Sequence, residues 1–171
     1  MDQHVNPITS DSKVNEYAMS DIIPYKDVKF VIMHCPFDKD SEWTIKKLKE
    51  YQIKHVFRLC NQDAYSIEPY SLNGIQIHDE IKFQDGGIPN KTQVQQWFDL
   101  VDKYNNEVIA VHCVSGIGRA PVLVALAFIH KGMDPLETIE YVRKFRRRAL
   151  NNVQINFLSE FKSDSACCSI Q

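Results

Sequence analysis

Cys113 and Arg119 are separated by five residues inside a loop that contains two glycines. The intervening residues are Val114, Ser115, Gly116, Ile117 and Gly118. Glycines allow a loop to turn tightly with its backbone N–H groups pointing inward. The apolar segment after Arg119, with Pro121 near its start, is typical of a helix whose positive dipole end faces such a loop. The pattern therefore predicts an anion-binding loop around the cysteine.

The two side chains suggest which anion the loop binds and what reaction follows. The planar guanidinium of Arg119 matches two oxygens of a phosphate group. The loop amides, the helix dipole and Arg119 would stabilise the thiolate of Cys113, which makes it a nucleophile at neutral pH. A cysteine at a strand end is more often a small buried hydrophobic residue. The strand–loop–helix context nevertheless favours attack on a phosphate ester to form a cysteinyl-phosphate, with the phosphate bound by residues 114–119.

Residues 112–121, with the sequence HCVSGIGRAP, resemble the signature loop of the cysteine-dependent protein tyrosine phosphatases. More narrowly, the chain resembles the PRL group (phosphatases of regenerating liver), a prenylated branch similar to dual-specificity phosphatases, from about residue 25 to its end. The resemblance implies that Cys113 is the nucleophile, that Arg119 holds the phosphate and that His112 supports the loop by hydrogen bonding. It implies neither a cofactor nor a metal. As in the PRL group, Ala120 stands where most phosphatases carry Ser or Thr, so the phospho-enzyme should break down slowly.

A phosphatase of this kind also needs a carboxylic acid that protonates the leaving oxygen. Asp85, in the stretch FQDGGIP, precedes two glycines that allow a hinge, and by resemblance it matches the acid of the family's mobile loop. The chain departs from the family at Ile81-Lys82, where Trp-Pro is usual, and at Gln84, which replaces a first aspartate. Asp63 and Asp79 are the alternative acids. Gln154 resembles a position that orients water in some phosphatases.

The spacing of apolar residues predicts the elements that position these groups. Strands are expected at residues 28–34, 55–59, 75–78 and 108–112, and helices at 41–51, 92–104, 120–129 and 153–161, with another beginning after Asp134. Leu136, Ile139, Val142 and Phe145 should face the core in that last helix. Alternating strands and helices predict a single α/β domain, with a central, mostly parallel twisted sheet flanked by helices. Residues 1–24 are expected to form a variable extension, 25–162 the phosphatase domain and 163–171 a flexible tail.

Composition excludes several classes of protein. The chain has 171 residues, of which 44% are hydrophobic, and a formal net charge of −2, which does not favour nucleic acid as a partner. The N-terminus lacks the layout of a secretory signal, and the apolar run 120–129 is too short to span a bilayer. Five cysteines without framework spacing indicate a reduced cytosolic protein without a structural metal.

The remaining cysteines suggest regulation and lipidation. By resemblance to the PRL group, Cys60 is expected to form a disulfide with Cys113 under oxidising conditions, whereas Cys35 is expected to be structural. The last four residues, Cys168-Ser169-Ile170-Gln171, fit the C-a-a-X motif, so a prenyltransferase should farnesylate Cys168. A basic cluster would help the lipid to bind membranes. Its members are Arg143, Lys144, Arg146, Arg147 and Arg148. We expect the protein on the cytoplasmic face of plasma or endosomal membranes, with a cytosolic pool.

Two functions from different classes share this loop. The first is a phosphatase with slow turnover that acts on phosphotyrosine, phosphoserine/threonine or a phosphoinositide. The second is a binding module, because in the PRL group the same loop receives an acidic segment of CBS-domain magnesium-transport mediators. Loop amides and an arginine bind carboxylates as readily as phosphates. The sequence leaves the substrate, the transporter partner and homo-oligomerisation open.

Overall fold

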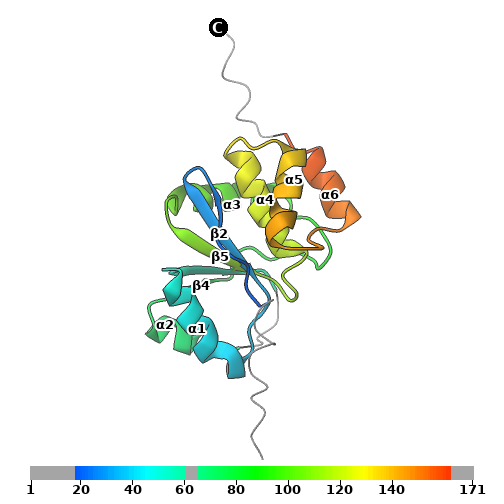
Figure 1. The fold of residues 1–171 in the computed structure, drawn as a ribbon. Coiled ribbons are helices and arrows are strands. Elements are labelled where there is room, and N and C mark those ends of the chain that lie inside the picture. Colours follow the sequence, from blue (N-terminus) through cyan, green and yellow to red (C-terminus); the bar gives the residue numbers. More distant parts are fainter. Residues whose placement is uncertain (1–17, 61–64, 163–171) are drawn as a thin grey trace, which may run out of the picture.

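The computed structural model describes residues 18–60 and 65–162. Its centre is a five-stranded sheet with the order β1-β2-β5-β3-β4 (Figure 1). The strands are β1 (Ile23–Tyr25), β2 (Val28–Met33), β3 (His55–Arg58), β4 (Gln76–His78) and β5 (Val108–His112). β2, β5, β3 and β4 are parallel, whereas β1 pairs antiparallel with β2. The predicted α/β domain with a mostly parallel sheet is confirmed.

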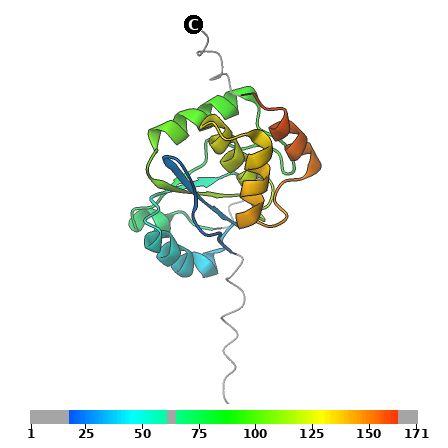
Figure 2. The same ribbon diagram turned by 45° about the horizontal axis from the view of Figure 1, so that its top comes forward.

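Helices cover both faces of the sheet, as the two views show (Figures 1 and 2). One face carries the 3-10 turn η1 (Asp38–Asp40) and the helices α1 (Ser41–Glu50) and α2 (Glu68–Leu72). The other face carries α3 (Lys91–Lys103), α4 (Arg119–His130), α5 (Pro135–Phe145) and α6 (Asn152–Ser159). Among the described residues, no helix has the length and apolar character needed to cross a membrane.

The larger core lies around α4, in which every residue from Arg119 to Ile129 is buried. A helix that is apolar all round can be stable only when other elements surround it, here β2, β5, α3, α5 and α6. Trp97 of α3 is fully buried in this core, and its indole N–H donates to the carbonyl of Leu123 at 2.7 Å. α4 is therefore held rigidly, and so is the loop that leads into it.

The cap of α5 agrees with the sequence-based prediction, but the buried face of its first turn does not. Asp134 caps α5 with its side chain, which accepts from the N–H groups of Leu136 and Glu137, and Pro135 follows as expected. Leu136, however, is 63% exposed, so the prediction that it faces the core is wrong. Leu136 lies in the first turn of α5, whereas Ile139 and Val142 in the following turns are buried against the core.

The N-terminal boundary of the sheet differs from the sequence-based one. β1 begins at Ile23, and Met19 forms an isolated bridge with Met33, so pairing starts before residue 25. Ile23 is fully buried. A three-residue edge strand that contains Pro24 is too short to show an alternating pattern, and proline is tolerated there because an edge strand has an unpaired side.

Candidate active site

The loop that joins β5 to α4, residues 113–119, is here named the signature loop. Four consecutive carbonyls of this loop accept hydrogen bonds from outside it. Val114 O accepts from Cys35 N at 3.0 Å, Ser115 O and Gly116 O accept from the guanidinium of Arg146, both at 3.1 Å, and Ile117 O accepts from Leu150 N at 2.7 Å. In a trans peptide the next N–H points opposite to the carbonyl. The N–H groups of residues 115–118 are therefore turned away from these partners, an orientation that suits anion binding.

Gly116 is required for this conformation. Its φ is +69°, in the left-handed region, and a Cβ built on it would lie 2.6 Å from Met33 O and 2.8 Å from Arg146 Nη2. Gly118 differs, because its φ is −116° and a Cβ there would meet only Gln154, at 3.5 Å. Of the two glycines, Gly116 allows the close approach of Arg146 and β2 to the loop.

Arg146 supports the signature loop, a structural role that the sequence did not indicate. The basic cluster was predicted to contact lipid, but Arg146 is only 9% exposed and its guanidinium holds the signature loop from behind. The prediction is therefore wrong for this member, because the chain after α5 folds back and carries Arg146 beneath the loop. The side chain of Arg143 donates to the carbonyls of Ala149 and Leu150, while Lys144, Arg147 and Arg148 are exposed.

Cys113 and His112 lie at the carboxyl end of β5, and both are buried, at 1% and 0% exposure. His112 contacts the carbonyl of Cys113 through Nδ1 at 3.2 Å and the hydroxyl of Tyr65 through Nε2 at 2.8 Å. The ring is thus fixed at both nitrogens. This agrees with the expected supporting role of His112, and Tyr65 is a partner that the sequence did not reveal.

Arg119 is 5% exposed, and its side chain lies between the signature loop and the segment after β4. Nη1 donates to Leu59 O at 3.1 Å and to Phe83 O at 3.4 Å. Nε lies 3.1 Å from Asp85 Oδ1, close enough for charge attraction, yet it has no aligned hydrogen-bond partner among the described residues. The guanidinium therefore keeps a buried donor that a phosphate oxygen can use.

Asp85 belongs to a segment, residues 83–89, here named the acid loop. Its carboxylate is 76% exposed, and the glycines beside it are fastened to α6 by side chains. Asn151 Nδ2 donates to Gly86 O at 2.9 Å, and Gln154 Nε2 donates to Gly87 O at 3.0 Å. Asn151 and Gln154 also form the capping box of α6. The start of α6 thus sets the position of Asp85, and Gln154, which the sequence predicts to orient water, contributes to this positioning.

The alternative acids do not match this position. Asp79 Oδ1 accepts from Arg58 Nε at 2.8 Å, and the same carboxylate lies 3.3 Å from Lys82. The hydrogen bond from Arg58 lowers the pKa of Asp79, and Arg58 and Lys82 together engage this carboxylate. Asp63 lies outside the described residues.

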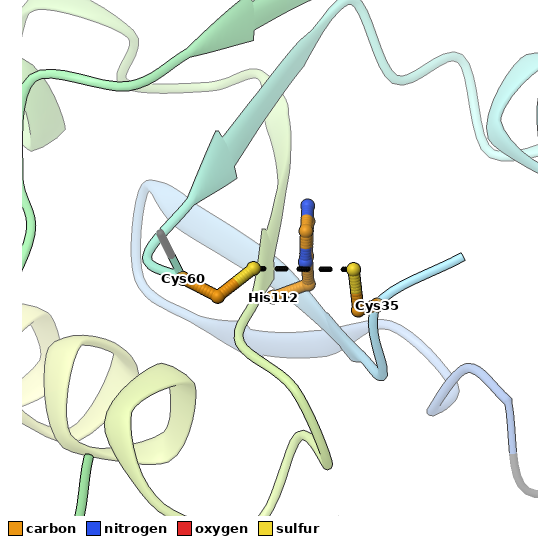
Figure 3. Close-up of side chains that lie close together, drawn as sticks. All are labelled: Cys35, Cys60 and His112. Atoms are coloured by element: carbon orange, nitrogen blue, oxygen red, sulfur yellow. Dashed lines mark hydrogen bonds between the residues drawn. The ribbon is translucent and has the colours of Figure 1, made fainter. Parts of the chain in front are cut away.

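The remaining predicted sites stand as follows. Cys60 is buried, and its sulfur lies 3.9 Å from the sulfur of Cys35 (Figure 3). These two cysteines and His112 form a cluster whose ligand atoms lie within 4.8 Å of one another. The predicted Cys60–Cys113 disulfide stays a prediction. Cys168 lies outside the described residues.

Comparison with known proteins assigns the chain to a family. The family model described as "Polymorphic toxin system, DSP-PTPase phosphatase" matches residues 25–133. The chain is 42% identical over 139 residues to a "Probable protein tyrosine phosphatase type IVA A" of Dictyostelium discoideum, with 79% of this chain and 82% of the relative covered. It is 39% identical over 145 residues to the "PRL-1 phosphatase" of Drosophila melanogaster, with 82% and 81% covered.

Among solved structures, a putative protein tyrosine phosphatase from Leishmania major superposes with a TM-score of 0.74 at 28% identity, covering 84% of this chain and 99% of the other. The chain therefore belongs to the PRL (type IVA) group of protein tyrosine phosphatases.

Proposed function

We propose that the protein hydrolyses phosphate monoesters through a cysteinyl-phosphate on Cys113. The observation that carries the proposal is the outward orientation of four signature-loop carbonyls, because it turns the N–H groups of residues 115–118 toward the place where a phosphate would lie. These donors, with the guanidinium of Arg119, would stabilise the charge on the transferring phosphoryl group. Preorganised donors of this kind need no rearrangement at the moment of reaction.

The reaction has two steps. In the first, the thiolate of Cys113 attacks phosphorus, an S–P bond forms and the P–O bond to the leaving group breaks. Asp85 gives its proton to the leaving oxygen. In the second step a water molecule attacks phosphorus, the carboxylate of Asp85 takes the water's proton, and the S–P bond breaks to release inorganic phosphate and the thiolate. The ion pair of Asp85 with Arg119 would be exchanged for an Arg119–phosphate contact when substrate enters.

Slow turnover follows from Ala120, the residue after Arg119 at the start of α4. Its side chain is fully buried and carries no hydroxyl. The sulfur of Cys113 would therefore leave phosphorus without a neighbouring hydroxyl to donate to it. The second step is thus expected to limit the rate, so that phospho-enzyme accumulates.

Membrane attachment is a second part of the proposal. Farnesylation of Cys168 would supply one lipid chain, which alone binds membranes weakly. The exposed residues Lys144, Arg147 and Arg148 would add attraction to anionic lipid. Intact-mass analysis after expression in a farnesylating host is expected to show one farnesyl group, which the Cys168→Ser variant lacks. A protein that stays unmodified in that host would contradict this part.

The catalytic proposal is tested by phosphate release from a panel of phosphopeptides and phosphoinositides, with Cys113→Ser beside the parent protein. The parent is expected to release phosphate and, after acid quenching, to carry one phosphoryl group on Cys113. The Cys113→Ser variant is expected to do neither. Retained turnover in Cys113→Ser would contradict the mechanism. The substrate preference within the panel, and the binding of CBS-domain magnesium-transport mediators or of a second copy, stay predictions.

A further inference from the structure

Three potential metal ligands meet at the carboxyl edge of the sheet, behind the signature loop. Cys35 follows β2, Cys60 follows β3, and His112 is the last residue of β5. β5 lies between β2 and β3 in the sheet, and the three strands are parallel. Their ends therefore converge, and the close-up shows the side chains of Cys35, Cys60 and His112 grouped together, with a dashed line joining the two sulfurs (Figure 3). The three residues are far apart in the sequence and do not form a recognisable metal-binding sequence motif.

The distances fit a tetrahedral metal ion better than a disulfide. The sulfurs of Cys35 and Cys60 are 3.9 Å apart. Two thiolates bound to one tetrahedral Zn²⁺ at about 2.3 Å lie about 3.8 Å from each other. A disulfide would require the sulfurs to approach to about 2.05 Å, which means that one strand end or side chain must move. The spacing already present is that of a metal-binding pair.

The third ligand, His112, can offer Nε2 to a metal ion in exchange for its hydrogen bond with Tyr65. Nδ1 of His112 lies 3.2 Å from the carbonyl of Cys113, an arrangement in which Nδ1 carries the proton and donates. The lone pair of Nε2 then points toward Tyr65, whose hydroxyl lies 2.8 Å away. Metal-binding histidines commonly donate their other N–H to a backbone carbonyl, which fixes the tautomer. The ring of His112 is preorganised in this way.

Burial and charge also suit a soft divalent cation. Cys35, Cys60 and His112 are 5%, 1% and 0% exposed, so the cluster is closed to bulk water. Two thiolates and one Zn²⁺ would form a group without net charge, which is less costly to bury than isolated ions.

We propose that Cys35, Cys60 and His112 bind one Zn²⁺ ion, with the Tyr65 hydroxyl oxygen or a water molecule as the fourth ligand. Binding forms two Zn–S bonds and one Zn–N bond to His112 Nε2, whose hydrogen bond with the Tyr65 hydroxyl is given up, and the two thiol protons pass to solvent. The site is distinct from the phosphate-binding surface, although His112 is bonded to Cys113 along the chain. Zinc would also occupy the sulfur of Cys60, so it competes with the predicted Cys60–Cys113 disulfide.

The proposal is tested with the reduced, full-length protein and two readouts that do not depend on catalysis. Zinc affinity is measured by competition with a chromophoric chelator. Cobalt(II) is then substituted for zinc, and its absorption spectrum is recorded. We expect one tight site per chain, with the intense ligand-field bands of tetrahedral cobalt and a thiolate-to-cobalt charge-transfer band. Cys35→Ser should lower the affinity at least about 100-fold and weaken the charge-transfer band.

Two control variants distinguish this site from other thiols. Cys113→Ser should keep the tight site, which excludes binding at the candidate nucleophile. The double variant Cys167→Ser/Cys168→Ser should keep it too, which excludes the C-terminal cysteines. Circular dichroism and a cooperative thermal melt establish whether Cys35→Ser folds. If it does not fold, the zinc affinity of Cys60→Ser and the cobalt spectrum of the parent protein test the proposed site instead.

The proposal is overturned if Cys35→Ser or Cys60→Ser binds zinc as tightly as the parent, if Cys113→Ser or the tail variant loses the tight site, or if cobalt shows no thiolate charge-transfer band. These outcomes are independent of phosphate release, so the metal site and the proposed reaction can fail separately.

Discussion

Asp85 and Arg119 come from separate segments and meet at 3.1 Å, measured from the carboxylate Oδ1 to the guanidinium Nε. Asp85 thus lies beside the residue that is expected to hold the phosphate. Hydrogen bonds from Asn151 and Gln154 to Gly86 and Gly87 hold the acid loop in this position. The acid is therefore positioned from two directions, by the charge of Arg119 and by the first turn of α6.

This geometry predicts that Asp85→Asn slows the first step in a way that depends on the leaving group. An amide cannot give the leaving oxygen a proton, so single-turnover rates with an alkyl phosphate should fall about 100-fold or more. Rates with a nitrophenyl phosphate, whose leaving group needs no proton, should change much less. Rapid-quench measurement of phospho-enzyme formation with the two substrates gives the comparison. Equal losses with both would show that Asp85 is not the acid.

Ala120→Ser should raise steady-state turnover about tenfold, since a hydrogen bond to a charged sulfur is worth about 1.5 kcal/mol. The new hydroxyl would stand at the start of α4 beside Arg119 and donate to the departing thiolate of Cys113. The initial burst of product should become smaller as the second step accelerates. Stopped-flow assays under excess substrate measure both quantities. If turnover and burst stay unchanged in the folded variant, the missing hydroxyl does not explain slow hydrolysis.

Arg146→Met should lower the free energy of unfolding by about 2–3 kcal/mol and reduce phosphate release. The substitution removes the donors to the carbonyls of Ser115 and Gly116, and leaving buried polar groups unpaired is costly. Arg147→Met is the matched control, because Arg147 is the next residue in the sequence and its side chain is exposed. Urea unfolding and inhibition by inorganic vanadate, a phosphate analogue, measure the effects. A variant as stable as Arg147→Met would argue against this supporting role.

The ion pair of Asp79 with Arg58 predicts a stability difference that depends on pH. Because the hydrogen bond from Arg58 lowers the pKa of Asp79 in the folded state, the stabilisation is present above the unfolded pKa of about 4 and is lost as pH falls through the folded value. Asp79→Asn should cost about 1 kcal/mol at pH 7, a modest value because the carboxylate is 37% exposed. Thermal unfolding of both proteins from pH 7 to pH 3 should show the difference shrinking. A difference that grows toward low pH would contradict the assigned pairing.

Much of the signature loop could be predicted from local sequence. A strand, a Gly-containing loop and an apolar helix occur in direct succession around Cys113, so the pattern that defines the site is also the pattern that folds it. β5 begins and ends at the predicted residues, and α3 differs from the prediction by one residue at each end. β1 could not be predicted, because three residues with a central proline carry no periodicity.

Sequence by itself determined the α/β class, the Cys113–Arg119 loop and Asp85 as the candidate acid, because each depends on residue types a short distance apart along the chain. Only the tertiary structure decided that Arg146 holds the loop, that α6 positions Asp85, and that Cys35, Cys60 and His112 meet. These contacts join residues more than twenty positions apart. Hydrophobic periodicity tells which face of an element is buried, but which distant side chain it meets depends on how the parallel strands and their crossovers pack together.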